Sequence, residues 1–298
     1  MAPTTTEIRM LSAGCLLAVL MALSVGSPPA APTQYTDSDP AAEAETTTIR
    51  VPGTTVSFDL AACPAGTMTD GEGDPVEIPP MLVLTTEVTW DLYDIFVYKL
   101  DESDGSSDAD AVSRPSKPYV PPDRGFGHDG YPAMGMTRKA AEQFCEWLSL
   151  KLDLPVRLPT PHEWTYLAAA GGDAPYCCGL EAESLGEAAW TRENSEHTTH
   201  PVGHKTTNAF GLFDVHGNVA EWVITDSRRP LAMGGSYRDP ADQCTAHATQ
   251  QQTNAWNQSD PQIPKSRWWL ADCSWVGFRF VIDATDGHLE IIKELSNE

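Results

Sequence analysis

The second half of the chain constrains the fold most, because it lacks the apolar spacing of a long helix. From residue 173 to the last dozen of its 298 residues, the sequence indicates only short strands and structured loops. The 22 glycines and 24 prolines favour turns and irregular segments. Nine tryptophans are many for this length, so we expect the loops to pack around indole rings.

Three helices are expected before residue 173. Helical apolar spacing places the first after Thr89 and the second within residues 137–152. The third has the strongest start signal, because Thr160 is suited to the N-cap, Pro161 to the first helical position and Glu163 to a capping box. A strand is expected within residues 54–66, which alternate between apolar and polar side chains.

The N-terminus indicates export to the periplasm or the extracellular space. A 16-residue apolar run at residues 10–25 suits a signal peptide and is too short for a membrane span. We therefore expect a signal peptide at residues 1–26, cleaved between Gly26 and Ala31; a lipid on Cys15 is the alternative. The polar, acidic residues 27–49 are predicted to be a disordered linker. A single domain at 50–285 and a tail at 286–298 follow.

The charge of the chain excludes some partners. With 42 acidic against 19 basic residues, the formal net charge is −23. A nucleic-acid binder needs a cationic surface, and so does a protein that adheres to anionic lipid. We therefore expect neither nucleic-acid binding nor adhesion to anionic lipid, and the short apolar run predicts no membrane span.

Residues 211–223, GLFDVHGNVAEWV, place two carboxylates around a tight turn inside an apolar segment. Asp214 and Glu221 flank the turn at Gly217 and Asn218. A carboxylate resists burial unless it has a partner, whereas calcium takes carboxylate oxygens and main-chain oxygens freed at turns. The residues alone leave two interpretations open, a calcium site and a solvated surface turn.

Five segments in order extend this interpretation. TEVTWDLYDIF, RLPTPHEWTYLAAAGG, HPVGHKTTNAFGLFDVHGNVAEWV, LAMGGSYRD and WVGFRFV together resemble the formylglycine-generating enzyme family, also called sulfatase-modifying factors, over residues 50–283. The resemblance implies a single α+β domain of the C-type-lectin-like kind, with few helices and short antiparallel strands. It also implies structural calcium, held by the side chains of Asp214 and Glu221 and by backbone oxygens of Gly217 and Val219.

The resemblance does not extend to the family's copper ligands. Those enzymes oxidise a sulfatase cysteine with two cysteines of their own, five residues apart, that bind copper(I). Here the second position is Cys244, but the first is Asp239. One carboxylate and one thiol suit copper(I) poorly, so we do not expect copper, and we assign no catalytic residue.

Cys244 has another use available. Export leaves an even number of cysteines in an oxidising compartment, which favours disulfides. A Cys244–Cys273 bond would close a 29-residue loop and stabilise the fold by about 3–4 kcal/mol. A free reactive thiol at Cys244 is the alternative. The pairing of Cys63, Cys177 and Cys178 stays open.

Two functions remain. In the first, an exported, calcium-stabilised domain binds a protein, a glycan or a small molecule in the groove that is the active site of the enzymes. The candidate binding residues are Ser236, Asp239, Arg267 and Trp269, although the indoles of residues 268–275 are also suited to a core. In the alternative, the protein is an oxidoreductase that converts a sulfatase cysteine to formylglycine with Cys244 and a second ligand that we do not identify.

Overall fold

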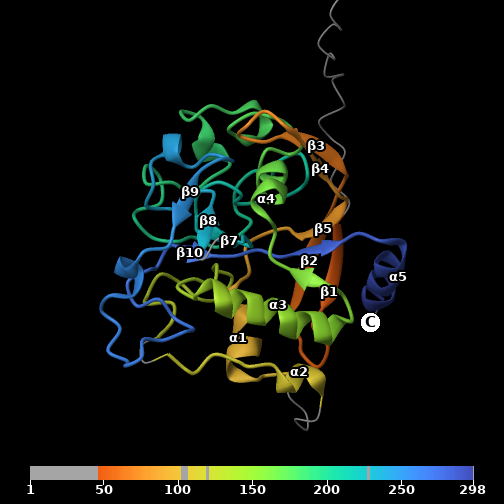
Figure 1. Ribbon diagram of the computed structural model, residues 1–298, viewed down its shortest axis with the longest axis vertical. Coiled ribbons are helices and arrows are strands. Elements are labelled where there is room, and N and C mark those ends of the chain that lie inside the picture. Colours follow the sequence, from red (N-terminus) through yellow and green to blue (C-terminus); the bar gives the residue numbers. More distant parts are fainter. Residues whose placement is uncertain (1–45, 102–106, 119–120, 227–228, 298) are drawn as a thin grey trace, which may run out of the picture. The chain divides into compact units, whose positions relative to one another are not determined.

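The computed structural model describes residues 46–101, 107–118, 121–226 and 229–297 (Figure 1). The predicted signal peptide, Cys15 and most of the predicted linker lie outside the described residues. The described residues belong to one compact unit, Glu43–Glu298. None of the helices in these ranges combines the length and the apolar character needed to cross a membrane.

A five-stranded antiparallel sheet joins the two ends of the domain. Its strands, in spatial order, are β1 (Thr46–Arg50), β2 (Ser57–Cys63), β5 (Met81–Leu84), β11 (Val281–Asp283) and β6 (Val156–Arg157). β11 pairs with both β5 and β6, so the C-terminal strand lies in the middle of the sheet. This pairing brings the GFR segment that precedes β11 next to the residues that follow β5.

β1 corrects the predicted linker boundary. Thr46–Arg50 pairs with β2, so residues 46–49 of the predicted linker belong to a strand. The physical reason is tertiary: Ile49 is buried and lies opposite Phe58, while threonines suit a strand. The polar composition of residues 46–48 hides this pairing in the sequence.

The second half of the chain contributes a smaller sheet. Its spatial order is β10 (Val276–Gly277), β7 (Ala220–Val223), β8 (Leu231–Met233) and β9 (Thr249–Gln251). β10 and β7 are parallel and the other pairs are antiparallel. A separate hairpin joins β3 (Gly66–Thr69) to β4 (Pro75–Ile78), and short 3-10 helices lie at Cys177–Gly179, Leu185–Glu187, Ala241–Gln243 and Asn254–Asn257.

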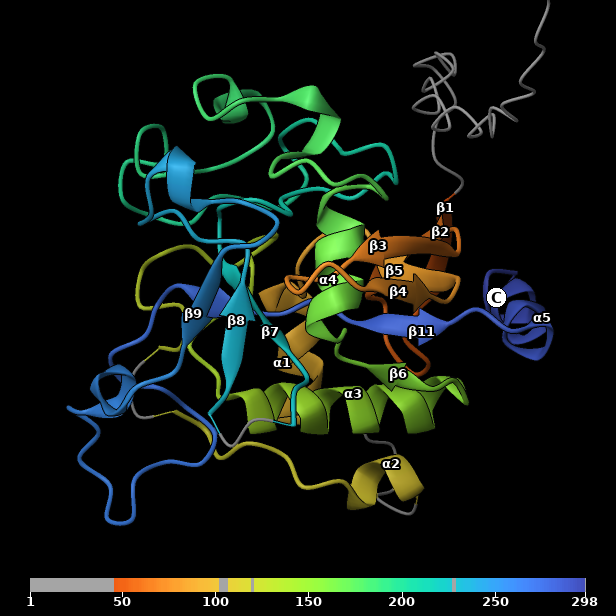
Figure 2. The same cartoon turned by 45° about the horizontal axis from the view of Figure 1, so that its top comes forward.

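The three predicted helices are confirmed: α1 (Trp90–Tyr98), α3 (Arg138–Leu152) and α4 (Pro161–Ala168). Thr89 caps α1, and Thr160 and Glu163 form the expected capping box of α4. α3 contacts β6 of one sheet and β7 of the other (Figure 2). α2 (Asp108–Ala111) was not predicted. α5 (Asp286–Leu295) forms within the predicted tail and buries Ile292.

Indole rings fill the core, as the composition predicts. Trp90, Trp147, Trp164 and Trp222 are among the largest fully buried side chains. The rings of Tyr93, Phe144 and Phe278 pack against one another with centroid separations of 5.3–5.9 Å. Trp90, Trp147 and Trp164 belong to α1, α3 and α4, and Trp222 belongs to β7, so these indoles come from regular elements and not from loops.

Candidate functional site

The turn between Asp214 and Glu221 is built from left-handed backbone. Asp214, Gly217 and Asn218 have φ angles of 52°, 78° and 44°. A Cβ atom on Gly217 would lie 2.2 Å from the carbonyl oxygen of Trp190, so only glycine fits there. The turn leads directly into β7, which places Glu221 in the interior.

Both predicted carboxylates are buried. Asp214 and Glu221 each expose 1% of their surface, so the solvated-turn interpretation is wrong. Glu221 accepts hydrogen bonds from Nε of Arg279 at 2.9 Å, from Nη2 of Arg279 at 2.8 Å and from Nε1 of Trp164 at 2.8 Å. Oδ2 of Asp214 accepts from the backbone N–H of Gly203 at 2.7 Å.

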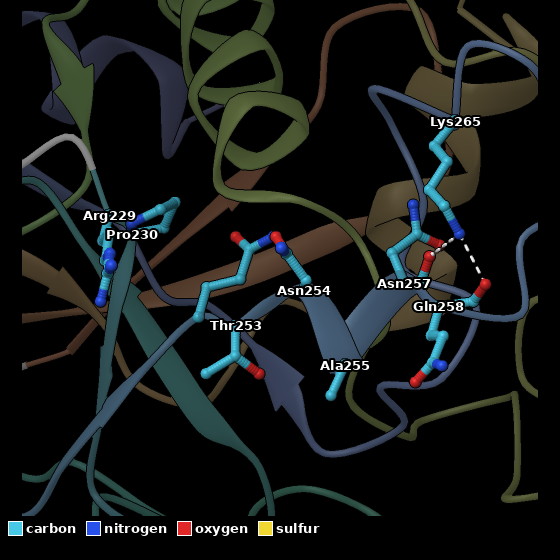
Figure 3. A pocket seen from close by; sticks show the side chains of 9 residues that line it. Arg229, Pro230, Thr253, Asn254, Ala255, Asn257, Gln258 and Lys265 are labelled. Atoms are coloured by element: carbon cyan, nitrogen blue, oxygen red, sulfur yellow. Dashed lines mark hydrogen bonds between the residues drawn. The ribbon is translucent and has the colours of Figure 1, made fainter.

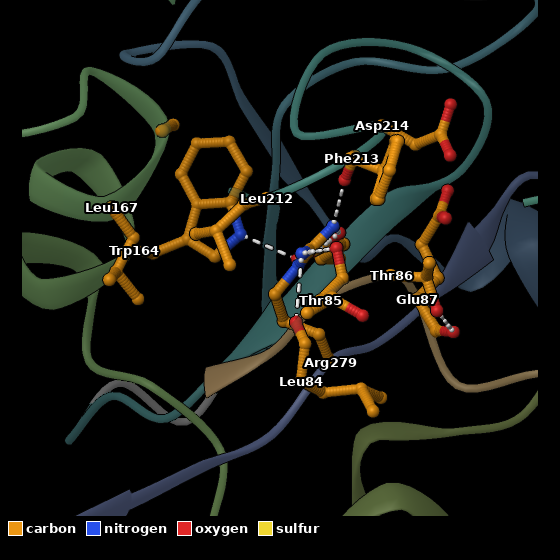
Figure 4. A network of polar contacts seen from close by, with 12 residues as sticks. Leu84, Thr85, Thr86, Glu87, Trp164, Leu167, Leu212, Phe213, Asp214 and Arg279 are labelled. Carbon is orange, nitrogen blue, oxygen red and sulfur yellow. Dashed lines mark hydrogen bonds and ion pairs between the residues drawn. The ribbon is translucent and has the colours of Figure 1, made fainter. Parts of the chain in front are cut away.

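Glu87 is a third carboxylate in this site, and the sequence analysis missed it. It lies between β5 and α1 and is fully buried. Both of its carboxylate oxygens, and Oδ1 of Asp214, have no hydrogen-bond partner among the described residues. In Figure 4 the side chains of Glu87 and Asp214 lie next to each other, close to Arg279. A charged residue three positions after the apolar strand β5 was the only local signal.

The electrostatics of this site show a shortage of positive charge. Burial raises the pKa of Glu87 well above its ordinary value, and the neighbouring Asp214 and Glu221 raise it further. Burial raises the pKa of Asp214 to about 6, against the lowering effects of the Gly203 N–H and of Arg279. Among the described residues Arg279 is the only side chain that forms an ion pair with one of these acids, namely Glu221. Its remaining donors bond to the carbonyl oxygens of Leu84, Thr85 and Phe213.

The residues fit a hard cation in part. Three buried carboxylate oxygens without partners on Glu87 and Asp214 match the oxygen ligands that calcium prefers. Glu221, by contrast, is engaged by Arg279. In the described part of the chain no three Asp, Glu, His or Cys side chains gather as a ready-made metal site. The carboxylates of Glu87 and Asp214 would therefore bind the cation together with main-chain oxygens and water. The backbone oxygens of Gly217 and Val219 remain the predicted main-chain ligands.

A second polar site surrounds Asp239. Its Oδ2 accepts hydrogen bonds from the Ser236 hydroxyl and from Nε2 of Gln250, both at 2.8 Å. Oε1 of Gln250 accepts from Nε1 of Trp275 at 2.9 Å, and the Arg238 guanidinium lies 3.9 Å from the centre of the Trp275 ring. A cavity of about 170 Å³ is lined by Arg238, Asp239, Gln250 and Trp275. An adjoining cavity of about 260 Å³ shares Asp239 and Gln250.

Cys244 lies behind this site and is fully buried. Its thiol points at the carbonyl oxygens of Ser236 and Asp239, at 3.7 and 3.8 Å. Burial, reinforced by the negative charge of Asp239, raises the pKa of the Cys244 thiol to about 12. Copper(I) binds thiolates, and the surroundings of this thiol favour its protonated form.

The predicted Cys244–Cys273 disulfide is not formed in the structure. Both side chains are buried free thiols, and burial raises the pKa of Cys273 to about 12 as well. They belong to different hydrophobic clusters: Cys244 packs with Tyr176 and Leu185, whereas Cys273 belongs to the main core. Sequence separation alone allowed the bond, and the packing of these clusters decided against it. The alternative, a free reactive thiol at Cys244, is also disfavoured, because the side chain is fully buried and its raised pKa favours the protonated form.

The four predicted binding residues do not form one site. Ser236 and Asp239 are hydrogen-bonded to each other, but Arg267 and Trp269 lie elsewhere. Trp269 lines an apolar cavity of about 330 Å³ together with Arg124 and Met134, and Arg267 stacks on Trp268 at 4.6 Å. Sequence reasoning missed Arg238 and Gln250, because three separate segments bring them together with Trp275.

A wider hollow of about 960 Å³ lies beside the segment that follows β9. Figure 3 shows its polar lining, which includes Arg229, Asn254 and Lys265. Nζ of Lys265 donates to the carbonyl oxygens of Asn257 and Gln258 at 2.5 and 2.6 Å. These bonds hold the loop between Asn257 and Lys265 in place.

The two-sheet fold, the acidic turn and the GGS segment beside Asp239 define the class of protein. Residues 34–284 match the family model of the sulfatase-modifying factor enzyme 1-like domain. The chain belongs to this family.

Relatives share parts of the sequence. The chain is 31% identical over 119 residues to the formylglycine-generating enzyme of Mycobacterium tuberculosis. The matched segment covers 34% of this chain and 38% of that protein. It is 35% identical over 98 residues to the serine/threonine-protein kinase pkn1 of Chlamydia pneumoniae, covering 32% of this chain and 14% of that protein. The matches thus span well under half of each relative.

Solved structures agree on the fold. Treponema denticola variable protein 1 superposes with a TM-score of 0.58 at 23% identity, covering 80% of this chain and 99% of that one. PvdO from Pseudomonas aeruginosa gives a TM-score of 0.58 at 20% identity, with the same coverage. These likenesses confirm the predicted single domain of the formylglycine-generating-enzyme type.

Proposed function

We propose that the protein is an exported, calcium-stabilised sulfatase-modifying-factor domain that binds a ligand in the groove beside Asp239. It does not make formylglycine by the copper route. The observation that carries the proposal is the state of Cys244, a buried thiol held against two carbonyl oxygens beside a carboxylate.

The chemistry of Asp239 supports this proposal. Its carboxylate is a hard oxygen ligand, and one oxygen already accepts bonds from Ser236 and Gln250. Copper(I) prefers soft sulfur ligands, so replacing the first thiol by this carboxylate removes half of the family's site. The same carboxylate raises the pKa of the Cys244 thiol and disfavours the thiolate that the remaining half needs.

Copper(I) binding and aldehyde formation test the proposal together. Purified protein should compete poorly with a copper(I) chelator and should yield no formylglycine from a sulfatase-type cysteine peptide supplied with oxygen. Asp239→Cys restores a pair of thiols five residues apart and should raise the copper(I) affinity. Asp239→Cys combined with Cys244→Ser is the matched control and should not. Aldehyde made by the wild-type protein, and lost in Cys244→Ser, would establish the oxidoreductase alternative instead.

Calcium is proposed for the acidic site because Glu87 and Asp214 present three buried oxygens without partners. A bound divalent cation would supply the positive charge that Arg279 alone does not. Its role is structural, since the site joins the segment after β5, the turn before β7 and the segment before β11 in one buried cluster.

Export is proposed from the apolar run at residues 10–25, which is followed by small residues and prolines. N-terminal sequencing of protein recovered from the host's envelope or medium should find a first residue between positions 27 and 32. A retained Met1, or a lipid on Cys15, would contradict export by this route.

A further inference from the structure

We infer that the small cavity between Arg238 and Asp239 binds a zwitterion, namely a free α-amino acid with a small side chain. The inference rests on the proposed ligand-binding role of this groove and names the class of ligand. Its basis is that Arg238 and Asp239, which carry opposite charges, both line the cavity. Among the described contacts they form no ion pair with each other.

Arg238 presents a preorganised cation. The carbon of its guanidinium lies 3.9 Å from the centre of the Trp275 ring, and that ring is held by the hydrogen bond of its own N–H to Gln250. No described residue accepts a hydrogen bond from the guanidinium. Its N–H edges are therefore available, and their planar fork matches a carboxylate with two parallel bonds.

Asp239 presents an oriented anion. Ser236 and Gln250 both donate to Oδ2, which fixes the plane of the carboxylate, and no described group donates to Oδ1. An ammonium group is the complementary partner for Oδ1.

Gln250 and Trp275 hold the two charges in place. The contacts run from Arg238 to Trp275, then to Gln250 and on to Asp239, and these four residues line the cavity. Its volume of about 170 Å³ is below the range of about 300–1,000 Å³ that is usual for drug-sized ligands. A molecule that carries both charges in this space is small, and a free amino acid has that chemistry.

Calorimetric titration with five probes tests the inference. Glycine, L-alanine and L-serine carry both charges, whereas N-acetyl-L-alanine lacks the ammonium group and L-alanine amide lacks the carboxylate. At least one of the three free amino acids should bind. Blocking either end of L-alanine should weaken its binding about tenfold or more, because each block removes a charge-assisted hydrogen bond.

Two variants assign the charges. Arg238→Gln should remove the preference for L-alanine over its amide, and Asp239→Asn should remove the preference over the N-acetyl compound. Arg267→Gln is the matched control, since Arg267 also stacks on an indole, that of Trp268, but does not line this cavity. It should bind like the wild-type protein.

Three results would overturn the inference: no binding of any free amino acid at millimolar concentration, equal binding of all five probes, or equal binding of L-alanine and N-acetyl-L-alanine. The last would show an anion site on Arg238 alone. These outcomes are separate from the copper and aldehyde assays. A protein that makes no aldehyde and binds no amino acid retains the proposed function and loses only this ligand class.

Discussion

Two buried acidic sites in this protein differ in where their positive charge comes from. The site around Asp101 contains its own cations, and the site of Glu87, Asp214 and Glu221 has one arginine for three carboxylates. Both are removed from solvent, so the same cost of burying a carboxylate applies to each. The comparison shows how the chain balances charge in one place and leaves it unbalanced in another.

Asp101 is fully paired. One oxygen lies 2.7 Å from Nη1 of Arg114, and the other accepts from Nζ of Lys151 at 2.7 Å and from Nε1 of Trp147 at 3.1 Å. Burial by itself would raise the pKa of Asp101, but these hydrogen bonds outweigh it and lower the pKa to about 2. In the other site burial prevails, and the pKa values of Glu87 and Asp214 are raised.

The largest expected difference is the response to removing a carboxylate charge. Asp101→Asn leaves Lys151 without its counter-charge and Arg114 with only the more distant Asp110, at 3.5 Å. It should lower the free energy of unfolding by about 3–5 kcal/mol. Glu87→Gln in metal-free buffer removes an acid that has no partner, so it should be neutral or stabilising. Urea unfolding monitored by tryptophan fluorescence measures both. Equal losses in the two variants would mean that Glu87 has a cationic partner within the protein.

Calcium should act on one site only. If calcium binds the native protein alone, a free concentration 100 times the dissociation constant stabilises it by about 2.7 kcal/mol. Melting temperatures in chelated and calcium-containing buffer should therefore differ for the wild type, and much less for Asp214→Asn or Glu87→Gln. Lys151→Met, which changes the other site, should keep the full calcium response. Identical wild-type curves with and without calcium would contradict the calcium proposal.

Acid should weaken the paired site. The pKa of Asp101 is about 2 in the folded protein and 3.8 in its ordinary state, so its stabilisation is present above pH 4 and is lost as the pH falls towards 2. The shift of nearly two pKa units corresponds to about 2.5 kcal/mol. The stability difference between wild type and Asp101→Asn should be constant above pH 4 and shrink below it. A difference that persists unchanged at pH 2 would show that packing, and not charge, accounts for it.

The smallest loss of stability is expected from removing one cation from the Asp101 site, which makes it more like the site of Glu87, Asp214 and Glu221. Lys151→Met removes one of two cations but leaves Arg114 and Trp147 on Asp101, so we expect a loss of about 1 kcal/mol. The pKa of Asp101 should rise at the same time, which would move the acid transition to higher pH. Chemical denaturation across pH 2–6 measures both changes, and an unaltered acid transition would show that Lys151 contributes nothing to the pairing.

Local signals in the sequence were sufficient for the helices and for the turn. Thr89 and the Thr160–Glu163 capping box define where α1 and α4 begin, because a cap acts on backbone groups within one helical turn. Gly217 and Asn218 likewise mark left-handed backbone whatever surrounds them. The order of the family motifs then predicted the domain type, which the comparisons confirm.

The composition of the sites was decided by tertiary structure. Glu87 is 127 residues from Asp214, and Arg279 reaches Glu221 across 58 residues, so no local pattern reveals that they meet. The separation of Cys244 from Cys273, and of Arg267 from the Asp239 cavity, depends in the same way on how loops pack around the indoles. Capping and turn geometry act over a few residues of chain, whereas electrostatic pairing and burial act through space. The sequence by itself therefore determined where the carboxylates and the turns are, and only the tertiary structure decided which charges have a partner.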